Sequence, residues 1–201
     1  MKYCFDLDDV ISNTYAELMK SSMRYHIKVL KYAYVYREIQ EAKGDYTYFY
    51  KTLNWKMDEL DDFFHTEYPA FLDRCVPNRN AINLINELYQ QNNEIHILSA
   101  REEREKCVVY KKTKEWLEKF GVKYDKVSIN VSTKSVYLNE NGIDIFVDDL
   151  WDNCVEAKKN SSSVVCHVRC EYNMRTNYDY SYGIIEIKDW NKFRDILKSL
   201  C

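Results

Sequence analysis

The chain has 201 residues, of which 46% are hydrophobic and 30% are charged. This balance predicts one packed domain, or a core with a smaller insertion, and argues against wholesale disorder. The formal net charge of −3 argues against a nucleic-acid polymer as partner, because such a partner requires a broad basic surface.

The cysteines and the first residues bear on the cellular compartment. The seven cysteines are odd in number and form no CxxC pair, so reduced thiols are expected rather than a disulfide framework or a zinc site. Carboxylates begin at Asp6, before the apolar core of a signal peptide could form. No apolar run approaches the roughly 20 residues that span a bilayer. These features predict a cytoplasmic protein without a membrane partner, and they say nothing about its oligomeric state.

The first predicted element is a short buried strand at residues 2–7, which ends in acidic residues. Apolar residues at helical spacing then predict a helix from Tyr15 to about Ala42, and another helix is predicted at residues 58–66. Residues 15–79 contain no strand pattern. We therefore expect these residues to form a small helical cap inserted after the first strand.

Beyond the cap, the sequence alternates between helical and strand patterns. The predicted helices are residues 81–88, 102–121 and 190–200, and the predicted strands are residues 94–98, 127–131, 143–147, 164–168 and 184–187. Strands separated by helices predict an α/β fold, a three-layer Rossmann-like parallel sheet with helices on both faces. The core would comprise residues 1–14 and 80–201, and the cap residues 15–79.

Polar side chains follow several of these strands at the point where each strand ends. They are Asp6 and Asp8 after the first strand, Ser99 and Arg101 after residues 94–98, and Asp148 and Asp149 after residues 143–147. Ligands of parallel α/β sheets bind beyond these carboxyl ends. Alternation directs Asp6 and Asp8 the same way, and carboxylates that close together are costly unless a cation or a shared proton offsets their repulsion. Mg²⁺, which prefers carboxylate ligands and retains waters, is the natural cation.

Four segments together resemble the motifs of haloacid-dehalogenase-type phosphatases. Residues 5–10, FDLDDV, resemble the DxD motif that opens that family, and residues 95–101, IHILSAR, resemble its second motif, a strand ending in Ser or Thr. Lys134, fourteen residues before Asp148, fits the lysine of the third motif, and residues 145–149, IFVDD, resemble the acidic fourth motif. Each segment alone is a weak signal, but all four occur in the family's order across nearly the whole chain.

The resemblance implies a magnesium-dependent phosphomonoesterase with a HAD-like fold. Asp6 would attack phosphorus and form an aspartyl-phosphate. Asp8 would protonate the leaving oxygen and then activate water. Mg²⁺ would be held by the Asp6 carboxylate, the Asp8 backbone carbonyl and one or both of Asp148 and Asp149.

The same resemblance implies a phosphate-binding set, which is Ser99, Ala100, Arg101 and Lys134. Lys134 would neutralise charge on the phosphoryl oxygens, although Lys123 and Lys126 lie nearby in sequence. Lys134 is preferred because Lys126 falls before the preceding strand. Arg101 has two open roles, which are to bind phosphate or to pair with Glu105.

A narrower resemblance is to the 5′(3′)-deoxyribonucleotidases, whose helical cap also follows the first motif directly. The similar segments are Ala100-Arg101, residues 113–117, Tyr124-Asp125, residues 171–175 and Trp190. Two residues depart from that family's pattern: Asp9 replaces the usual glycine, and Asn13 stands where an aspartate is common. Both departures leave the nucleophile and the acid/base in place, so they bear on the substrate more than on the reaction. The implied substrate is a (deoxy)nucleoside monophosphate.

An aromatic-rich stretch of the predicted cap contains Tyr46, Phe49 and Trp55. Aromatic residues of this kind are more often core, since a small cap needs their large buried area. Stacking on a nucleotide base is nevertheless worth about 1–3 kcal/mol, so these three residues are the candidates for substrate contact.

Two other functions stay open at this point. A phosphatase for sugar phosphates or other small metabolites would use the same motifs, because fold does not determine substrate. A non-catalytic phosphate-binding protein on the same scaffold is the alternative of another class, and the intact Asp6, Asp8 and Lys134 argue against it.

Overall fold

The computed structural model describes residues 1–33, 53–103 and 108–200 of the chain. A six-stranded parallel sheet in the order β5-β4-β1-β6-β7-β8 forms its centre. The strands are β1 (Lys2–Asp6), β4 (Glu94–Leu98), β5 (Lys126–Ser128), β6 (Ile145–Asp148), β7 (Val164–Val168) and β8 (Ile185–Ile187). The central strand β1 pairs with β4 and β6, with Phe5 opposite both Ile97 and Val147. Strands covered on both faces are continuously apolar, as β1 is from Tyr3 to Phe5.

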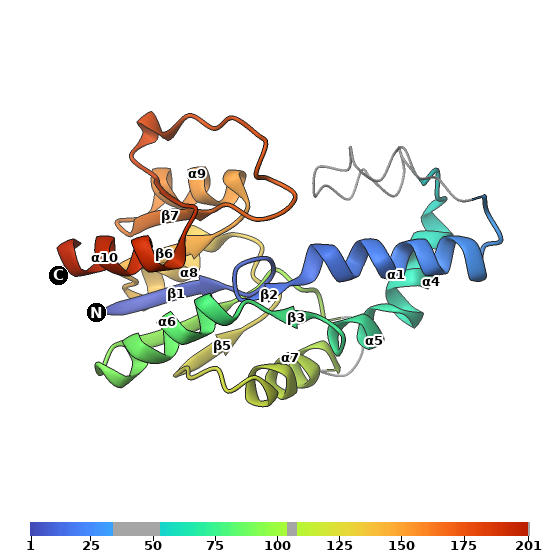
Figure 1. Cartoon of the computed structure of the whole chain (residues 1–201), viewed down its shortest axis with the longest axis horizontal. Coiled ribbons are helices and arrows are strands. Elements are labelled where there is room, and N and C mark those ends of the chain that lie inside the picture. Colours follow the sequence, from blue (N-terminus) through green and yellow to red (C-terminus); the bar gives the residue numbers. More distant parts are fainter. Residues whose placement is uncertain (34–52, 104–107, 201) are drawn as a thin grey trace.

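Helices cover both faces of this sheet (Figure 1). They are α6 (Arg79–Gln90), α7 (Val108–Lys119), α8 (Lys134–Asn141), α9 (Trp151–Asn160) and α10 (Trp190–Leu200). One apolar cluster joins Phe5 to Ile85 of α6, Trp116 of α7 and Phe193 of α10. A second cluster joins the opposite face of the sheet to α8 and α9. The α/β fold with a three-layer parallel sheet, expected from the sequence, is confirmed.

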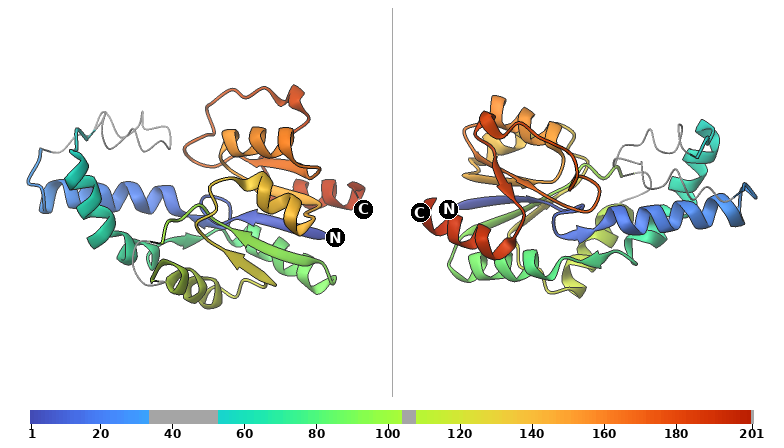
Figure 2. Two further views of the ribbon diagram at one scale, coloured as in Figure 1. Left: turned by 180° about the vertical axis from the view of Figure 1, so that it is seen from behind. Right: turned by 45° about the horizontal axis from the view of Figure 1, so that its top comes forward.

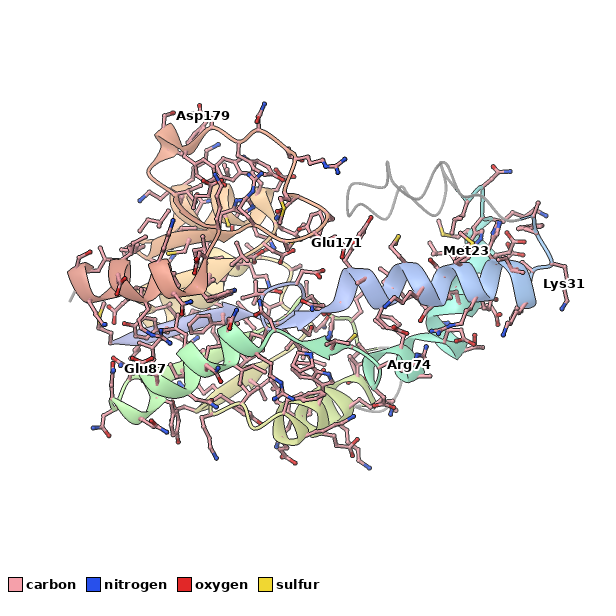
Figure 3. The ribbon with its side chains drawn as sticks, viewed as in Figure 1. Met23, Lys31, Arg74, Glu87, Glu171 and Asp179 are labelled. Atoms are coloured by element: carbon pink, nitrogen blue, oxygen red, sulfur yellow. The ribbon has the colours of Figure 1, made fainter. Side chains whose placement is uncertain are left out.

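A group of helices extends beyond the carboxyl edge of the sheet, opposite the two termini (Figures 1 and 2). They are α1 (Thr14–Lys28), α4 (Met57–Thr66) and α5 (Tyr68–Leu72). Residues Tyr25, Trp55 and Phe63 lie in an apolar cluster of this group. Arg74, labelled in Figure 3, donates to Glu17 of α1 at 2.8 Å and so ties the end of α5 to α1.

The chain enters and leaves this helical group through a short antiparallel pair of strands. They are β2 (Ser12–Asn13) and β3 (Val76–Pro77), with Ser12 opposite Pro77 and Asn13 opposite Val76. The expectation that residues 15–79 contain no strand is therefore wrong at β3. Two residues are too short to show a periodic pattern, and their pairing partner lies 63–65 positions away in the chain.

The long helix predicted over residues 15–42 is also too long. The structure ends α1 at Lys28, and Lys31 adopts a left-handed backbone with φ 60°. The amide of Leu30 donates to the Tyr25 carbonyl at 3.1 Å, which closes the helix end. Leu30 packs on the apolar cluster of Tyr25 and Phe63 without continuing the helix. Residues 34–42 of the predicted helix lie outside the described part of the chain.

The helix predicted from Glu102 begins later than expected. Glu102 and Glu103 are not helical, and α7 begins at Val108. The Glu103 carboxylate accepts hydrogen bonds from the amides of Val109 and Tyr110 at 3.1 and 2.9 Å. Acidic side chains stabilise free amides at a helix start, which explains why an acidic segment precedes α7. None of the described helices is long and apolar enough to span a membrane.

Candidate active site

Three polar residues predicted from the sequence lie at the carboxyl ends of neighbouring strands. Asp6 ends β1, Ser99 directly follows β4, and Asp148 ends β6. Each is largely buried, with exposed fractions of 6%, 1% and 0%. Because β1 lies between β4 and β6, the parallel register brings the three residues to one edge of the sheet.

Asp6 is bonded at both carboxylate oxygens. The ammonium of Lys134, the first residue of α8, donates to Oδ1 at 2.6 Å, and the backbone amide of Asp8 donates to Oδ2 at 2.9 Å. Burial raises the pKa of Asp6 to about 7, against the opposing charge of Lys134. Burial also disfavours the ammonium of Lys134, but the charges of Asp6 and Asp148 outweigh it and raise the pKa of Lys134. The two side chains therefore form a buried ion pair at the sheet edge.

The other two lysines lie elsewhere. Lys126 is the first residue of β5, and its ammonium is 3.4 Å from Glu94, the first residue of β4. That pair is at the amino edge of the sheet, opposite Asp6. Lys123 is exposed between α7 and β5. Among these three lysines, the structure brings only Lys134 to the acidic residues.

Asp8 is held by a ring of donors. Arg101 donates from Nη2 to Oδ1 at 2.7 Å and from Nε to Oδ2 at 3.0 Å. Thr14 donates to Oδ1 at 2.5 Å, and Ser99 donates to Oδ2 at 3.1 Å. Burial favours the protonated form of Asp8, but the Arg101 charge and the hydrogen bonds of Arg101, Thr14 and Ser99 keep its pKa below the ordinary value. Asp8 is thus a carboxylate in this geometry.

The remaining nitrogen of Arg101 is also engaged. Nη1 donates to Oγ1 of Thr113, a fully buried residue of α7, at 3.1 Å. The Arg101 amide donates to Oγ of Ser99 at 3.1 Å. Ala100, between them, is exposed. The alternative pairing of Arg101 with Glu105 falls on a residue outside the described ranges.

Asp148 and its surroundings fix the third strand end. Its Oδ1 accepts from the Leu150 amide at 2.8 Å, and its Oδ2 accepts from Asn153 of α9 at 3.0 Å. Burial raises its pKa even though the Lys134 charge lowers it. The start of α9 therefore sets the direction of this carboxylate.

Asp149 is held by the loop that follows β7. The Tyr172 hydroxyl donates to Oδ2, Asn173 donates to the Asp149 carbonyl at 2.9 Å, and a ring nitrogen of His167 lies 3.0 Å from that carbonyl. Burial, followed by the charges of Asp148 and Asp9, holds the pKa of Asp149 well above its usual range. Neither the role of Tyr172 nor that of Asn173 was predicted; the resemblance of residues 171–175 to a nucleotidase segment was the only signal.

Asp9, predicted only as a departure from the family pattern, has a structural task. Its backbone is left-handed, with φ 54°, a conformation that favours glycine. Both carboxylate oxygens lie 3.1 Å from the amide of Tyr15 in the first turn of α1, where a negative charge is favourable. Burial, with the charges of Asp8 and Asp6, raises the pKa of Asp9 to about 8.

The edge holds more acidic side chains than basic ones. Its five carboxylates are Asp6, Asp8, Asp9, Asp148 and Asp149, and its two cations are Lys134 and Arg101. A divalent cation would offset this imbalance. Among the described residues, no three His, Cys, Asp or Glu side chains form a ready metal cage. The implied ligand set fits nonetheless, because one Asp6 oxygen, the Asp8 carbonyl, one further carboxylate and waters satisfy Mg²⁺.

The surroundings of Trp55 favour core packing, the first of the two roles predicted for this residue. It is only 3% exposed, its ring centroid lies 5.4 and 5.3 Å from those of Tyr25 and Phe63, and its Nε1 donates to His26 at 2.9 Å. Trp55 is therefore part of the apolar cluster of the helical group, where its large ring is fully used in packing. Tyr46 and Phe49, the other two candidates, lie outside the described residues.

A cavity of about 290 Å³ opens beside Asp9. The start of α1 and the loop after β7 form its walls, lined by Asp9, Asn13, Ala16, Asn78, Val168, Arg169, Cys170 and Glu171. Figure 3 shows Glu171 beside the first turns of α1. Both departures from the nucleotidase pattern, Asp9 and Asn13, thus line the same cavity.

No protein-family model matches the chain, and no curated protein does. Solved structures do match over nearly the whole length. A haloacid dehalogenase-like hydrolase from Streptococcus pneumoniae is 11% identical with a TM-score of 0.73, covering 100% of this chain and 98% of that one. A HAD-superfamily hydrolase of subfamily IA from Geobacter sulfurreducens is 9% identical with a TM-score of 0.65, covering 98% and 95%.

A third similar structure is described as a proposed β-phosphoglucomutase from Thermotoga maritima. It is 14% identical with a TM-score of 0.69, covering 100% of both chains. At such identities the likeness concerns the fold, and none of the three is described as a nucleotidase. The six-stranded parallel sheet and its helices therefore give this chain the fold of the haloacid-dehalogenase-like hydrolases.

Proposed function

We propose that this protein is a magnesium-dependent phosphomonoesterase that hydrolyses a small phosphorylated substrate through an aspartyl-phosphate on Asp6. One observation carries the proposal. Asp6 and Asp8 lie side by side at the sheet edge, Asp6 paired with Lys134 at 2.6 Å and Asp8 with Arg101 at 2.7 Å. A nucleophile, an acid/base and cations for a phosphate are the groups that phosphoryl transfer to an aspartate requires.

Each residue has a defined part in the reaction. An oxygen of Asp6 forms a bond to phosphorus while the bond to the leaving oxygen breaks. Asp8, which is a carboxylate in the geometry described above, first takes up a proton from solvent and then gives it to the leaving oxygen. Lys134 holds Asp6 at Oδ1 and neutralises charge on the phosphoryl oxygens. In the second half, Asp8 removes a proton from a water molecule while the water oxygen bonds to phosphorus. The bond between phosphorus and Asp6 breaks, and inorganic phosphate is released.

The metal site is part of the same proposal. Mg²⁺, when bound, would neutralise the phosphoryl group and hold it in line with the nucleophile. Asp6, the Asp8 carbonyl and one of the two strand-end aspartates would hold it. Each Asp148 oxygen already uses one of its lone-pair positions for a hydrogen bond, as each Asp6 oxygen does, whereas Oδ1 of Asp149 accepts none from the described residues and keeps both positions. We therefore assign the inner-sphere oxygen to Asp149, which Tyr172 orients.

The proposed division of the chain is a core of residues 1–14 and 80–201 with a cap of residues 15–79. The apolar cluster around Phe63 and the single strand pair β2–β3 support this division. The cap would cover the phosphate and contact the leaving group, as lids that exclude water do. A cytoplasmic location stays a prediction from the reduced cysteines.

The substrate class has two candidates. The nucleotidase assignment rests on sequence resemblance, and the burial of Trp55 argues against base stacking by this residue. A sugar-phosphate phosphatase fits at least as well, because the Thermotoga protein of the same fold is described as a phosphoglucomutase, an enzyme of sugar phosphates. Polar groups such as Asn13, Asn78 and Glu171 line the cavity beside Asp9, and such groups suit a hydroxyl-rich leaving group.

A two-step experiment tests the proposal. Hydrolysis of p-nitrophenyl phosphate is measured with EDTA, with Mg²⁺ restored and with Ca²⁺. EDTA should abolish turnover, Mg²⁺ should restore it and Ca²⁺ should restore it poorly, because its larger and more flexible shell disturbs in-line attack. A panel of mononucleotides and sugar phosphates then separates the two substrate classes. Absence of turnover with Mg²⁺ would refute the enzyme assignment, and full turnover in EDTA would refute the metal.

A further inference from the structure

The contacts of Asp8 are saturated. Oδ1 accepts from Arg101 and Thr14, and Oδ2 accepts from Arg101 and Ser99. A carboxylate oxygen offers about two lone-pair positions. Neither oxygen therefore has a position left for a proton or a water in this arrangement. A general acid/base at Asp8 must first lose one of its donors.

Arg101 is the donor best suited to leave. Thr14 and Ser99 are short neutral side chains that each have a second hydrogen-bond partner, Ser12 and the Arg101 amide respectively. The guanidinium is the one charged donor among the three, and guanidinium groups bind phosphate oxygens in the same forked geometry as carboxylate oxygens. A phosphoryl dianion is thus a direct competitor of Asp8 for this side chain.

The protein holds Arg101 at a second point that does not depend on Asp8. Nη1 donates to Thr113 at 3.1 Å, and Thr113 is fully buried on α7. The Arg101 side chain itself is 5% exposed, so it has little room to swing into solvent. A small rotation about the Thr113 contact would move Nε and Nη2 from Asp8 while keeping the charge at the sheet edge.

We propose, on the basis of the function proposed above, that Arg101 exchanges partners during the reaction. It binds Asp8 in the geometry described here and transfers to the phosphoryl group when substrate binds. The transfer frees Asp8 for proton transfer only once a phosphate is in place. Arg101 is then both a phosphate ligand and the residue that couples substrate binding to release of the acid/base.

A double-mutant cycle on phosphate affinity tests the exchange. Inorganic phosphate is titrated calorimetrically, in Mg²⁺, into the wild-type protein, Asp8→Asn, Arg101→Gln and the double variant. Asp8→Asn removes the competitor of the phosphate, so its phosphate dissociation constant should fall about tenfold, the worth of one charge-assisted hydrogen bond. When Arg101 is already replaced by Gln, Asp8→Asn should alter the phosphate dissociation constant by less than about twofold.

Asp9→Asn is the matched control. It replaces a neighbouring acidic side chain of the same cluster, but Asp9 is bonded to the Tyr15 amide and not to Arg101. Any gain in phosphate affinity from Asp9→Asn should be equal in the two Arg101 backgrounds. Arg101→Lys, which keeps the charge and loses the fork, is measured alongside in case Arg101→Gln does not fold, and should give an intermediate gain.

The outcomes separate the exchange from the proposed function. An Arg101-dependent gain with Asp8→Asn supports the exchange. An equal gain in both backgrounds, with hydrolysis of p-nitrophenyl phosphate by the wild-type protein, overturns the exchange and leaves the phosphatase assignment standing. Absence of both phosphate binding and hydrolysis in the wild-type protein overturns both.

Discussion

The carboxyl edge of the sheet and the apolar cluster of the helical group bury opposite kinds of side chain. The edge gathers five aspartates against two cations. The apolar cluster of the helical group packs Tyr25, Trp55 and Phe63 together. The polar groups of its aromatic rings are hydrogen-bonded, since the Tyr25 hydroxyl donates to Asp62 and the Trp55 ring nitrogen donates to His26. Burial of aromatic surface stabilises a fold, whereas clustered like charges destabilise it unless a ligand binds. The two regions should therefore respond differently to substitution, in rate or in stability.

The largest expected effect is on rate at the edge. Asp6→Asn keeps the shape of the side chain but replaces the carboxylate nucleophile with an amide, so kcat on p-nitrophenyl phosphate should fall by about 10⁴-fold or more. Urea unfolding and circular dichroism should show a folded protein. Substantial turnover by the purified, folded variant would contradict the covalent mechanism.

The second-largest expected effect is on the stability of the fold, through the apolar cluster of the helical group. Phe63 is fully buried and its ring lies 5.3–5.4 Å from those of Tyr25, Trp55 and Phe64. Phe63→Ala should lower the free energy of unfolding by about 3–5 kcal/mol, measured by urea titration. Phe63→Leu, which leaves a smaller gap, is the control and should cost clearly less. A loss below about 1 kcal/mol for Phe63→Ala would show that this cluster is not a packed core.

A smaller effect should appear in metal affinity. Tyr172→Phe removes the hydroxyl that orients Asp149, and loss of such a supporting hydrogen bond costs about 10–100-fold in metal affinity. The Mg²⁺ concentration for half-maximal turnover should rise accordingly, with little change in urea unfolding.

Tyr178→Phe is the matched control for that substitution. Tyr178 lies in the same loop, but its ring packs on Trp151 and His167 with centroid distances of 4.9 and 4.7 Å, and the hydroxyl that donates to Asp149 is that of Tyr172. It should leave the Mg²⁺ requirement unchanged. An equal rise for both variants would assign the effect to the loop as a whole.

The smallest effect concerns the amino edge of the sheet, where the charges are paired and exposed. A hydrogen bond from His96, followed by one from Lys126, lowers the pKa of Glu94 to about 2. A carboxylate whose pKa is lower in the folded than in the unfolded protein stabilises the fold at pH values above its unfolded pKa, near 4.5. This stabilisation is lost as the pH falls towards 2. Because the group is exposed, we expect about 1 kcal/mol or less. The free energies of unfolding of the wild-type protein and Glu94→Gln, measured by urea titration, should differ at pH 6 and converge near pH 2–3. A difference that stays constant with pH would refute this explanation.

Local patterns predicted most of the sheet. The strands at Glu94–Leu98 and Val164–Val168 and the helix at Trp190–Leu200 have the predicted bounds, because each is a continuous or strongly periodic apolar run. The end of α1 at Lys28 was missed because Val29 and Tyr32 keep the apolar spacing while the backbone turns at Lys31. A pattern of side chains does not report a backbone reversal of this kind.

The site was predictable in its residues but not in its pairings. Asp6, Asp8 and Lys134 were identified from motif order and lie together. For Arg101 the two predicted roles were to bind phosphate or to pair with Glu105, which lies outside the described residues; the carboxylate that Arg101 contacts among the described residues is that of Asp8, 93 positions away. Tyr172 is likewise 23 positions from Asp149. Sequence spacing suggests pairs between residues close in the chain. The order of the strands brings distant loops to one edge of the sheet, and this order determines the long-range pairs of Arg101 and Asp149.

The strand pair β2–β3 has a consequence for how such a protein could change over time. The chain leaves the sheet at Ser12–Asn13 and returns at Val76–Pro77, so the two ends of a long excursion are hydrogen-bonded neighbours. An inserted segment whose two ends are neighbours can be exchanged for a segment of different length without moving the strands that it joins. Domain insertions are tolerated at such closely spaced ends for the same reason. Residues 14–75 are therefore a candidate unit for grafting, provided that the donor replaces the contacts of Phe71, Leu72 and Cys75 with the apolar cluster of the sheet. A chimera with the corresponding unit of another protein of this fold should keep Asp6 and Lys134 in place while acquiring the donor's choice of leaving group.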